Sequence, residues 1–241
     1  MIELNHIFFS IIGYFLGSIP TGLIFGKLVL KKDISKTGNK TIGASNIFYL
    51  SNFKFASIVF VIDCFGKGFL PLLLISIIFP YSDFFQYGTI FSLFILLGHN
   101  WSIFLKFKGG RGQALIMGSL LIFNIPLTIL MCITLLIFWM ISKDGGISWI
   151  ITLLVLMITS LSSITIIDNW ILIVTISMYL LITMIKRIMG NNSIKKSIVV
   201  NNISKKKIFF NRLFLDRDIL EKSISSKITT SIKDKSETIK F

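Results

Sequence analysis

Residues 113–142 read QALIMGSLLIFNIPLTILMCITLLIFWMIS, a run of 30 residues without a charged side chain. A helix needs about 20 apolar residues to cross a ~30 Å hydrocarbon core, so this stretch belongs in a membrane. Asn124 and Pro126 mark a turn inside it, which predicts two spans. The first half, 113–123, is short for a full crossing, so it must begin in the preceding glycine-rich loop or thin the bilayer locally.

The rest of the chain has the same apolar character. Of its 241 residues, 54% are hydrophobic and 15% charged, and the mean hydropathy is +0.82; soluble domains carry roughly a quarter charged residues. This composition excludes a soluble enzyme, a secreted disulfide scaffold and a free nucleic-acid binder. Cys64 and Cys132 lie inside apolar runs and are interpreted as small packing residues, so neither a disulfide nor a metal site is expected. The other runs are Ile7–Leu30, Phe53–Phe79, Phe85–Leu105, Ile147–Ile167 and Trp170–Ile185.

Basic residues fall into segments that predict the topology. The net charge is +5 up to Ile185 (11 Lys/Arg against 6 Asp/Glu) and +9 from Lys186 onward (14 against 5). The lysines between positions 27 and 54, the basic loop 106–111 and the tail belong on the cytoplasmic side. The segments that would face the other side offer Glu3, Asp83 and Asp168 and no Lys or Arg. If the basic loop and the tail lie on the same side, the chain must cross the membrane an even number of times between them. Three apolar runs lie there, and dividing the run 113–142 into two spans makes the number of crossings four.

The predicted fold is therefore an all-α polytopic membrane protein. It is a bundle of seven transmembrane helices with polar cytoplasmic motif loops, with the N-terminus outside and the tail in the cytoplasm. Residues 1–190 are expected to form the transmembrane domain. Residues 191–241 are expected to form a basic tail that is either disordered or amphipathic on the membrane surface, where residues 203–222 mix aromatic and basic side chains.

Two polar segments carry the candidate chemistry, and the first is KKDISKTGNKTIGASN at residues 31–46. Its glycines permit backbone turns whose N–H groups converge on an anion, and its other side chains donate hydrogen bonds. An ordinary polar connector is the alternative interpretation. The candidate ligands are Thr37, Gly38, Asn39, Gly43, Ser45 and Asn46.

The second segment is GHNWSIFLKFKGGRG at residues 98–112. Glycines that let the backbone close on a phosphate, with cations beside them, suit a phosphate ester. The positive-inside rule alone explains the charges but not three glycines in four positions. The segment is not a Walker A loop, because no Lys-Ser/Thr pair closes it. The candidate ligands are Lys106, Lys108, Gly109, Gly110, Arg111 and Gly112.

Four motifs in order resemble the bacterial acyl-phosphate:glycerol-3-phosphate acyltransferases. The chain has GSIPTG at 17–22, TGN…IGASN within 37–46, DCFGKG at 63–68 and the glycine-rich segment at 98–112. The corresponding family patterns are G-S-I-P-x-G, G-S-G-N-I-G-A-T-N, D-x-x-K-G and G-H-x-x-P-x-F-x-x-F-x-G-G-K-G. The resemblance covers roughly residues 14–118, and it too implies seven spans.

The chain is a divergent member by this comparison. Thr37 and Ser45 keep a hydroxyl where the family has serine and threonine, two residues are inserted near 40–41, and Tyr49 stands at an arginine position, for which Lys40 or Lys54 is the candidate replacement.

The family has three cytoplasmic motif regions, and the last of them, which we call the third motif, is R-H-x-x-N-I-x-R-L followed by a glutamate. It is largely lost in this chain. Its nearest match is LITMIKRIM, with Leu181 at the histidine position, Met184 at the asparagine position and Lys186–Arg187 retained. In the glycine-rich segment at 98–112, Arg111 replaces lysine.

The resemblance implies transfer of a fatty acyl group from acyl phosphate to glycerol 3-phosphate, giving lysophosphatidic acid in membrane phospholipid biosynthesis. Thr37, Asn46 and His99 are then the candidate catalytic residues, the remaining candidates bind substrate, and no cofactor or metal is expected. The expected partners are both substrates and membrane lipids, with other phospholipid-synthesis enzymes as further candidates and no nucleic acid. The alternative, favoured by the lost third motif, is a degenerate homologue that binds lipid phosphate or scaffolds other synthases.

Asp63 and Lys67 stand four residues apart in an apolar run. Ionisable residues inside a membrane are costly and usually face the protein interior or a cavity. Two interpretations remain open, a structural ion pair within one helix and a place in the site.

Overall fold

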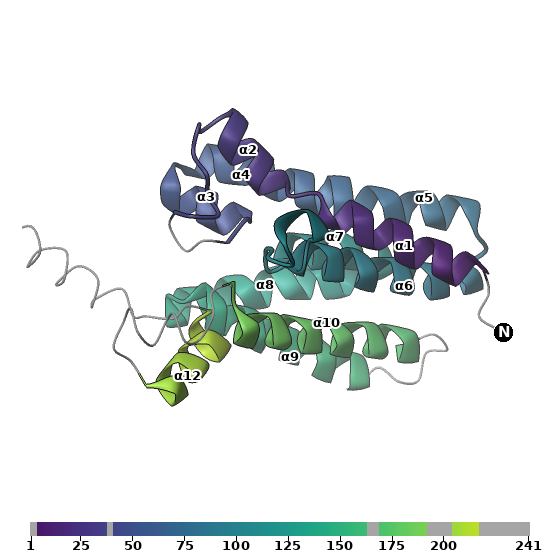
Figure 1. The fold of residues 1–241 in the computed structure, drawn as a ribbon. Coiled ribbons are helices and arrows are strands. Elements are labelled where there is room, and N and C mark those ends of the chain that lie inside the picture. The colour runs from purple at the N-terminus through teal and green to yellow at the C-terminus, as the bar shows by residue number, and fades with distance from the viewer. Residues whose placement is uncertain (1–3, 38–40, 163–168, 192–203, 217–241) are drawn as a thin grey trace, which may run out of the picture. The chain divides into compact units, whose positions relative to one another are not determined.

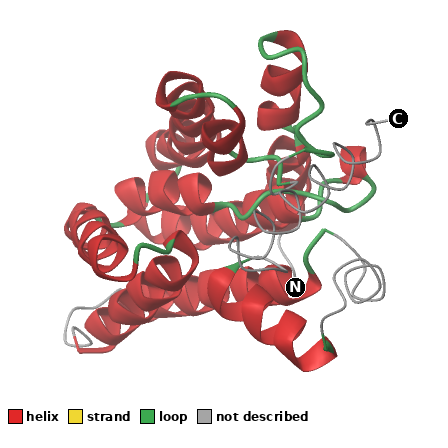
Figure 2. Cartoon of the chain, turned by 90° about the vertical axis from the view of Figure 1, so that its left-hand side faces the viewer, coloured by secondary structure: helices red, strands yellow, loops and turns green. Residues whose placement is uncertain are grey.

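The computed structural model describes residues 4–37, 41–162, 169–191 and 204–216, and within these ranges the chain consists of helices and loops without a strand (Figure 2). Two compact units divide the chain, Met1–Lys186 and Arg187–Phe241. In chain order the helical elements (Figure 1) are α1 (Leu4–Ser18), α2 (Thr21–Leu28), α3 (Ala44–Leu50), α4 (Phe53–Val61), the π-helix η1 (Ile62–Phe69), α5 (Leu70–Ile78), α6 (Tyr81–Asn100), the 3₁₀-helix η2 (Ile103–Leu105), α7 (Gln113–Phe123), α8 (Ile125–Ser142), α9 (Gly145–Ser162), α10 (Asn169–Met189) and α12 (Lys205–Leu215).

Five helical stretches of the described residues are long and apolar enough to cross a membrane. They are Leu4–Leu28, Phe53–Ile78, Ile125–Ser142, Gly145–Ser162 and Trp170–Met189. Large apolar side chains such as Ile77, Ile141 and Trp170 are exposed on their outer faces, as expected where lipid rather than water surrounds the helices. The prediction of an all-helical, multi-pass membrane protein is confirmed.

The run 113–142 divides at the predicted turn. Asn124 adopts an extended conformation (φ −161°, ψ 103°) between α7 and α8, and its side-chain oxygen accepts a hydrogen bond from the Leu127 N–H. Pro126 lies in the first turn of α8, where its missing N–H breaks no helical hydrogen bond. α7 has 11 residues, about 16 Å at 1.5 Å per residue.

The first two apolar runs are less regular than the sequence predicted. The run 7–30 breaks at Ile19–Pro20 into α1 and α2, because proline lacks the N–H that would continue the helical ladder. The run 53–79 contains the π-helix η1 at Asp63 and Lys67. The D-x-x-K-G pattern has two residues between aspartate and lysine, and this chain has three. Because a π-helix closes i→i+5 hydrogen bonds, the wider turn takes up the extra residue and keeps both charged side chains on one buried face.

α1 packs along α6 in the same direction (Figure 1). Gly13 faces Phe91 and Gly17 faces Ile95, so the residue numbers of the two helices rise in the same direction along the contact. A Cβ atom added to Gly17 would lie 2.0 Å from the Ile95 carbonyl oxygen. The helices therefore approach as closely as their backbones allow, which small residues make possible in membrane helix pairs.

Replacing Gly17 with alanine is expected to destabilise the protein by at least about 1–3 kcal/mol, the usual cost of overpacking a close contact. The midpoint of thermal unfolding in detergent measures the loss. Gly145→Ala is the matched control, because a Cβ there meets nothing within 4 Å. Equal midpoints for the two variants would contradict this close packing of α1 on α6.

Candidate functional site

The glycine-rich segment folds into a compact loop between α6 and α7. The Ser102 N–H donates to the Lys108 carbonyl (3.1 Å), and the Gly110 N–H donates to the His99 carbonyl (3.0 Å). Lys106 has a left-handed backbone (φ 53°), which turns the chain back toward the end of α6. We call residues 106–112 the glycine loop.

Only glycine fits at the centre of the glycine loop. A Cβ on Gly109 would lie 2.2 Å from the His99 carbonyl oxygen, and one on Gly110 would lie 2.1 Å from His99 Nε2. Both glycines and the His99 side chain are buried. The structure thus brings three predicted site residues together, with the imidazole directly beneath the backbone that is the candidate phosphate ligand.

The cations of this region have different environments. Lys106 and Lys108 are exposed. Arg111 Nη1 donates to the Lys186 carbonyl oxygen (3.3 Å), and Lys186 is itself buried with Nζ 5.3 Å from the Trp101 ring centroid. Lys186 was absent from the predicted ligands, although its place at the end of an apolar run and in the third motif was a usable signal.

Asn100 is a second residue that the sequence did not single out. Its side chain is 0% exposed, and neither its Oδ1 nor its Nδ2 has a hydrogen-bond partner among the residues that the structure describes. A Cβ on Gly112 would lie 3.3 Å from Asn100 Oδ1, so the amide borders the glycine loop. Buried amides without partners are rare, and we therefore add Asn100 to the candidate site.

Asn46 organises the first polar segment. Its buried Nδ2 lies within hydrogen-bond distance of three carbonyl oxygens, those of Ile34 (2.8 Å), Thr37 (3.1 Å) and Thr41 (2.8 Å). These contacts draw the segment 34–41 around one side chain. A carboxamide used in this way shapes the loop, and the catalytic role expected of Asn46 stays a prediction.

The other candidates of this segment lie near its surface. Thr37 and Ser45 are exposed, and the Thr37 hydroxyl donates to the Asp33 carbonyl (3.1 Å). Gly43 precedes α3, and a Cβ there would meet nothing within 4 Å. A hydrogen bond from Ser35 lowers the pKa of Asp33. Gly38 and Asn39 lie outside the described residues.

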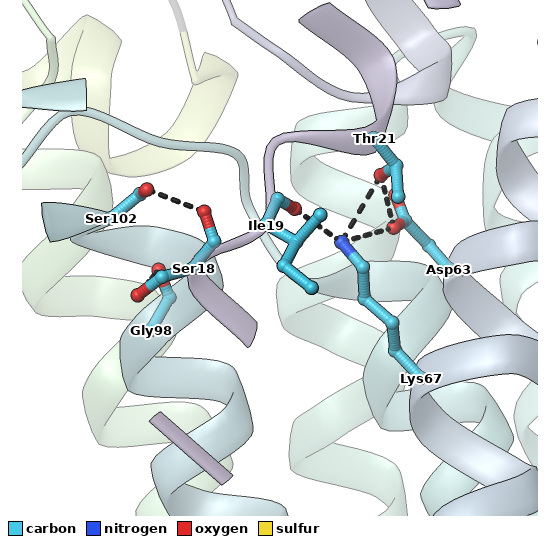
Figure 3. Close-up of polar contacts among 7 residues, drawn as sticks. All are labelled: Ser18, Ile19, Thr21, Asp63, Lys67, Gly98 and Ser102. Atoms are coloured by element: carbon cyan, nitrogen blue, oxygen red, sulfur yellow. Dashed lines mark hydrogen bonds and ion pairs between the residues drawn. The ribbon is translucent and has the colours of Figure 1, made fainter. Parts of the chain in front are cut away.

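Asp63 and Lys67 form a buried ion pair with a structural task (Figure 3). Lys67 Nζ lies 2.9 Å from Asp63 Oδ1 and donates to the Ile19 carbonyl (2.6 Å), while the Thr21 hydroxyl donates to Asp63 Oδ1 (2.6 Å). Ile19 and Thr21 flank Pro20, where the α1–α2 helix breaks. The pair therefore adds hydrogen bonds to the residues on both sides of the break.

The same break also holds the glycine-rich segment (Figure 3). Ser102 Oγ donates to the Ser18 carbonyl (2.6 Å). Leu105 packs against an apolar cluster beneath the first polar segment, formed by Leu23, Ile34, Ile42, Ile47, Ala56 and Val59. The two segments predicted to bind anions thus share one apolar support and belong to one region of the first unit.

Comparison with known proteins identifies the family. A Glycerol-3-phosphate acyltransferase from Listeria monocytogenes is 33% identical over 174 residues, 72% of this chain and 85% of that protein. One from Aster yellows witches'-broom phytoplasma is 37% identical over 139 residues, 52% of this chain and 58% of that protein. The fold matches the crystal structure of PlsY, an integral membrane glycerol 3-phosphate acyltransferase in its glycerol 3-phosphate form, with a TM-score of 0.67 and 22% identity over 85% of this chain and 98% of that chain. Since the family model for glycerol-3-phosphate acyltransferase also matches residues 7–195, the chain belongs to this family.

Proposed function

We propose that the protein transfers a fatty acyl group from acyl phosphate to glycerol 3-phosphate, giving lysophosphatidic acid and inorganic phosphate. The observation that carries this proposal is the glycine loop, in which buried backbone at Gly109–Gly110 is flanked by Lys106, Lys108 and Arg111 at the end of an apolar helix bundle. Such a loop suits a phosphate ester whose acyl chain lies among the helices. Family membership, and the glycerol 3-phosphate and lysophosphatidic acid forms of the solved relative, support the same reaction.

The chemistry requires placement and charge stabilisation rather than a strong base. The glycerol hydroxyl oxygen bonds to the acyl carbonyl carbon, the bond from that carbon to the phosphate oxygen breaks, and the hydroxyl proton passes to the departing phosphate. The cations beside the glycine loop stabilise the charge that collects on the phosphate, and holding both substrates in place removes much of the entropic barrier. We assign Arg111 to the phosphate, the exposed Thr37 to substrate contact, and His99 and Asn46 to shaping the two loops.

Purified full-length protein is expected to form lysophosphatidic acid from labelled glycerol 3-phosphate with a long-chain acyl phosphate, and none with the corresponding acyl-CoA. The reason is that the phosphate oxygens of an acyl phosphate can accept the hydroxyl proton while the bond to carbon is still breaking, whereas the sulfur of a thioester is not basic until it has left, so acyl-CoA needs a separate base. Equal turnover with both donors would disprove the donor assignment.

The same assay tests the second candidate function, a non-catalytic homologue that binds lipid phosphate. The observation in its favour is the lost third motif, where Leu181 is exposed on α10 and Met184 stands at the asparagine position. Turnover with neither donor, together with retained binding of glycerol 3-phosphate, would support this alternative.

We also propose seven spans, with α6 and α7 added to the five long apolar stretches, the N-terminus outside and the tail cytoplasmic. Two contacts support this count. The hydroxyls of Thr89 in α6 and Thr175 in α10 lie 3.1 Å apart. Trp101, 12 residues after Thr89, contacts Lys186, 11 residues after Thr175. Residue numbers therefore rise together along both helices, so α6 and α10 run in the same direction. That requires an even number of reversals between them, as separate crossings by α7, α8 and α9 provide.

Cysteine labelling checks this topology in a variant whose native Cys64 and Cys132 are replaced by serine. Single cysteines at Lys108 and Ser204 are expected to react only from the cytoplasmic side, and one at Asp83 only from the outside. The physical reason is the parity of crossings between these positions. Labelling of the first two positions from opposite sides would overturn the seven-span arrangement.

A further inference from the structure

The second unit fixes a short helix to the end of a membrane span. α12 begins 16 residues after Met189, the last residue of the candidate span Trp170–Met189. Arg212 Nη1 donates to the carbonyl oxygens of Ile188 (3.2 Å) and Met189 (2.8 Å), at the C-terminal end of α10. The position of α12 relative to Ile188 and Met189, which belong to the same unit, is therefore set by hydrogen bonds.

A second arginine makes the reciprocal contact. Arg187 Nη1 donates to the Leu213 carbonyl oxygen (3.2 Å) in the last turn of α12, and both arginine side chains are buried. The last carbonyls of a helix lack partners within the helix, and its C-terminal end attracts positive charge. Each arginine thus caps the helix to which it does not belong, so the contact joins both helix ends.

The faces of α12 differ in composition. Ile208, like Arg212, is buried, whereas Phe209, Phe210 and Phe214 are 46%, 58% and 38% exposed. The rings of Phe210 and Phe214 lie 4.7 Å apart and form one apolar patch. Three exposed phenylalanines on an 11-residue helix are costly in water.

The first turn of α12 adds charge beside this patch. Lys205, Lys206 and Lys207 are all exposed, and the Ser204 side chain caps the helix by accepting a hydrogen bond from the Lys207 N–H. At about 16 Å, α12 is too short to cross a bilayer. A short helix with aromatic residues and adjoining lysines is typical of one that lies in the interface of an anionic membrane.

We propose that α12 is an interfacial anchor that recognises anionic lipid in the bilayer that holds α10. Phe209, Phe210 and Phe214 insert at the level of the upper acyl chains, and the three lysines contact lipid phosphates. The arginine caps hold the helix at the height at which α10 leaves the membrane. This inference does not depend on the proposed acyl transfer.

Depth-dependent quenching tests the proposal on the full-length protein. The native cysteines are replaced by serine, Phe210→Cys carries a fluorescent label, and the protein is reconstituted in bilayers of phosphatidylcholine alone or of phosphatidylcholine with an equal amount of phosphatidylglycerol. Lipids brominated on the upper acyl chain are expected to quench the label strongly in the anionic bilayer and weakly in the zwitterionic one. One molar salt is expected to reduce the quenching, because it screens the lysines.

A matched pair of charge variants separates recognition by α12 from general attraction. Lys205→Gln/Lys206→Gln/Lys207→Gln is expected to lower the ratio of docked to undocked helix roughly a hundredfold, since each lysine near an anionic surface is worth about fivefold. Lys233→Gln/Lys235→Gln/Lys240→Gln removes the same charge from the same tail and is expected to keep most of the quenching. Thermal unfolding in detergent verifies that both variants fold.

Four results would overturn the proposal. Equal quenching in both bilayers, or equal loss in both triple variants, would show that α12 does not recognise anionic lipid. A label that a water-soluble quencher reaches and the brominated lipid does not would place the patch in water. A label that neither quencher reaches would show that protein covers the patch.

Discussion

Arg111→Ala is expected to lower kcat/KM for glycerol 3-phosphate roughly ten- to a hundredfold, because a hydrogen bond to a charged group is worth about 1.5–3 kcal/mol. Lys143→Ala is expected to leave it nearly unchanged. Both substitutions remove one positive charge beside a glycine pair, Gly109–Gly110 or Gly145–Gly146, so the general electrostatic field drops equally. Only Arg111 belongs to the loop proposed to hold a phosphate.

The structure sharpens this comparison. Arg111 is half-buried, and its contact with the Lys186 carbonyl aligns the guanidinium along the end of α10. Lys143 is exposed, and its Nζ lies 5.7 Å from the Trp139 ring centroid. Arg111→Lys is expected to be milder than Arg111→Ala, because it keeps the charge while losing the paired geometry of a guanidinium.

Measuring both the kinetic constants and the unfolding midpoint of Arg111→Ala distinguishes a residue that binds phosphate from one that only holds the glycine loop in place. If Arg111 only tethers the glycine loop, Arg111→Ala lowers the unfolding midpoint and reduces activity with every substrate alike. A phosphate ligand instead raises KM or lowers kcat for phosphate-bearing substrates at an unchanged midpoint. Equal small losses for Arg111→Ala and Lys143→Ala would show that the basic loop serves topology alone.

Local patterns in the sequence predicted most of the architecture. Long apolar runs, the turn at Asn124 and the spacing of Asp63 and Lys67 are each determined by residues close together in the chain. The same holds for the glycine loop, since Gly109 and Gly110 meet His99 only ten or so residues away. The sequence therefore grouped residues that the structure also brings together, and their role in a site stays a prediction.

The features that the sequence did not predict arise from contacts between residues far apart in the chain. Lys186 joins the site through Trp101 and Arg111, which lie far away in the chain. Asn100 became a candidate only because its buried amide lacks partners. The π-helix η1 is equally invisible to periodicity, because one extra residue between two charged side chains leaves the apolar pattern almost unchanged.

The largest expected effect on stability belongs to the buried ion pair. Lys67→Met leaves the Asp63 carboxylate buried with the Thr21 hydroxyl but without its counter-charge, and removing one partner of such a pair costs about 3–5 kcal/mol. Asp63→Asn removes the opposite charge and is expected to cost a similar amount. The unfolding midpoints of the purified variants in detergent measure both losses.

The double variant Asp63→Asn/Lys67→Met is expected to recover most of this loss, because no unpaired charge remains inside the membrane. It does not recover everything, since the Lys67 hydrogen bond to the Ile19 carbonyl is lost. That carbonyl still accepts from the Thr21 N–H (3.0 Å), so the residual loss is that of one hydrogen bond, about 0.5–1.5 kcal/mol. The difference between the double variant and the sum of the single variants gives the coupling energy.

The pair Asp33 and Lys36 is the control for this cycle. Its atoms lie 3.5 Å apart, but the Lys36 side chain is 80% exposed and that of Asp33 is 32% exposed. Exposed pairs couple by less than about 1 kcal/mol, so Asp33→Asn/Lys36→Met is expected to behave additively. If the Asp63–Lys67 cycle is equally additive, the two charges do not depend on each other. Their burial would then come from the surrounding helices, and the break at Pro20 would be held by Thr21 and Lys67 separately.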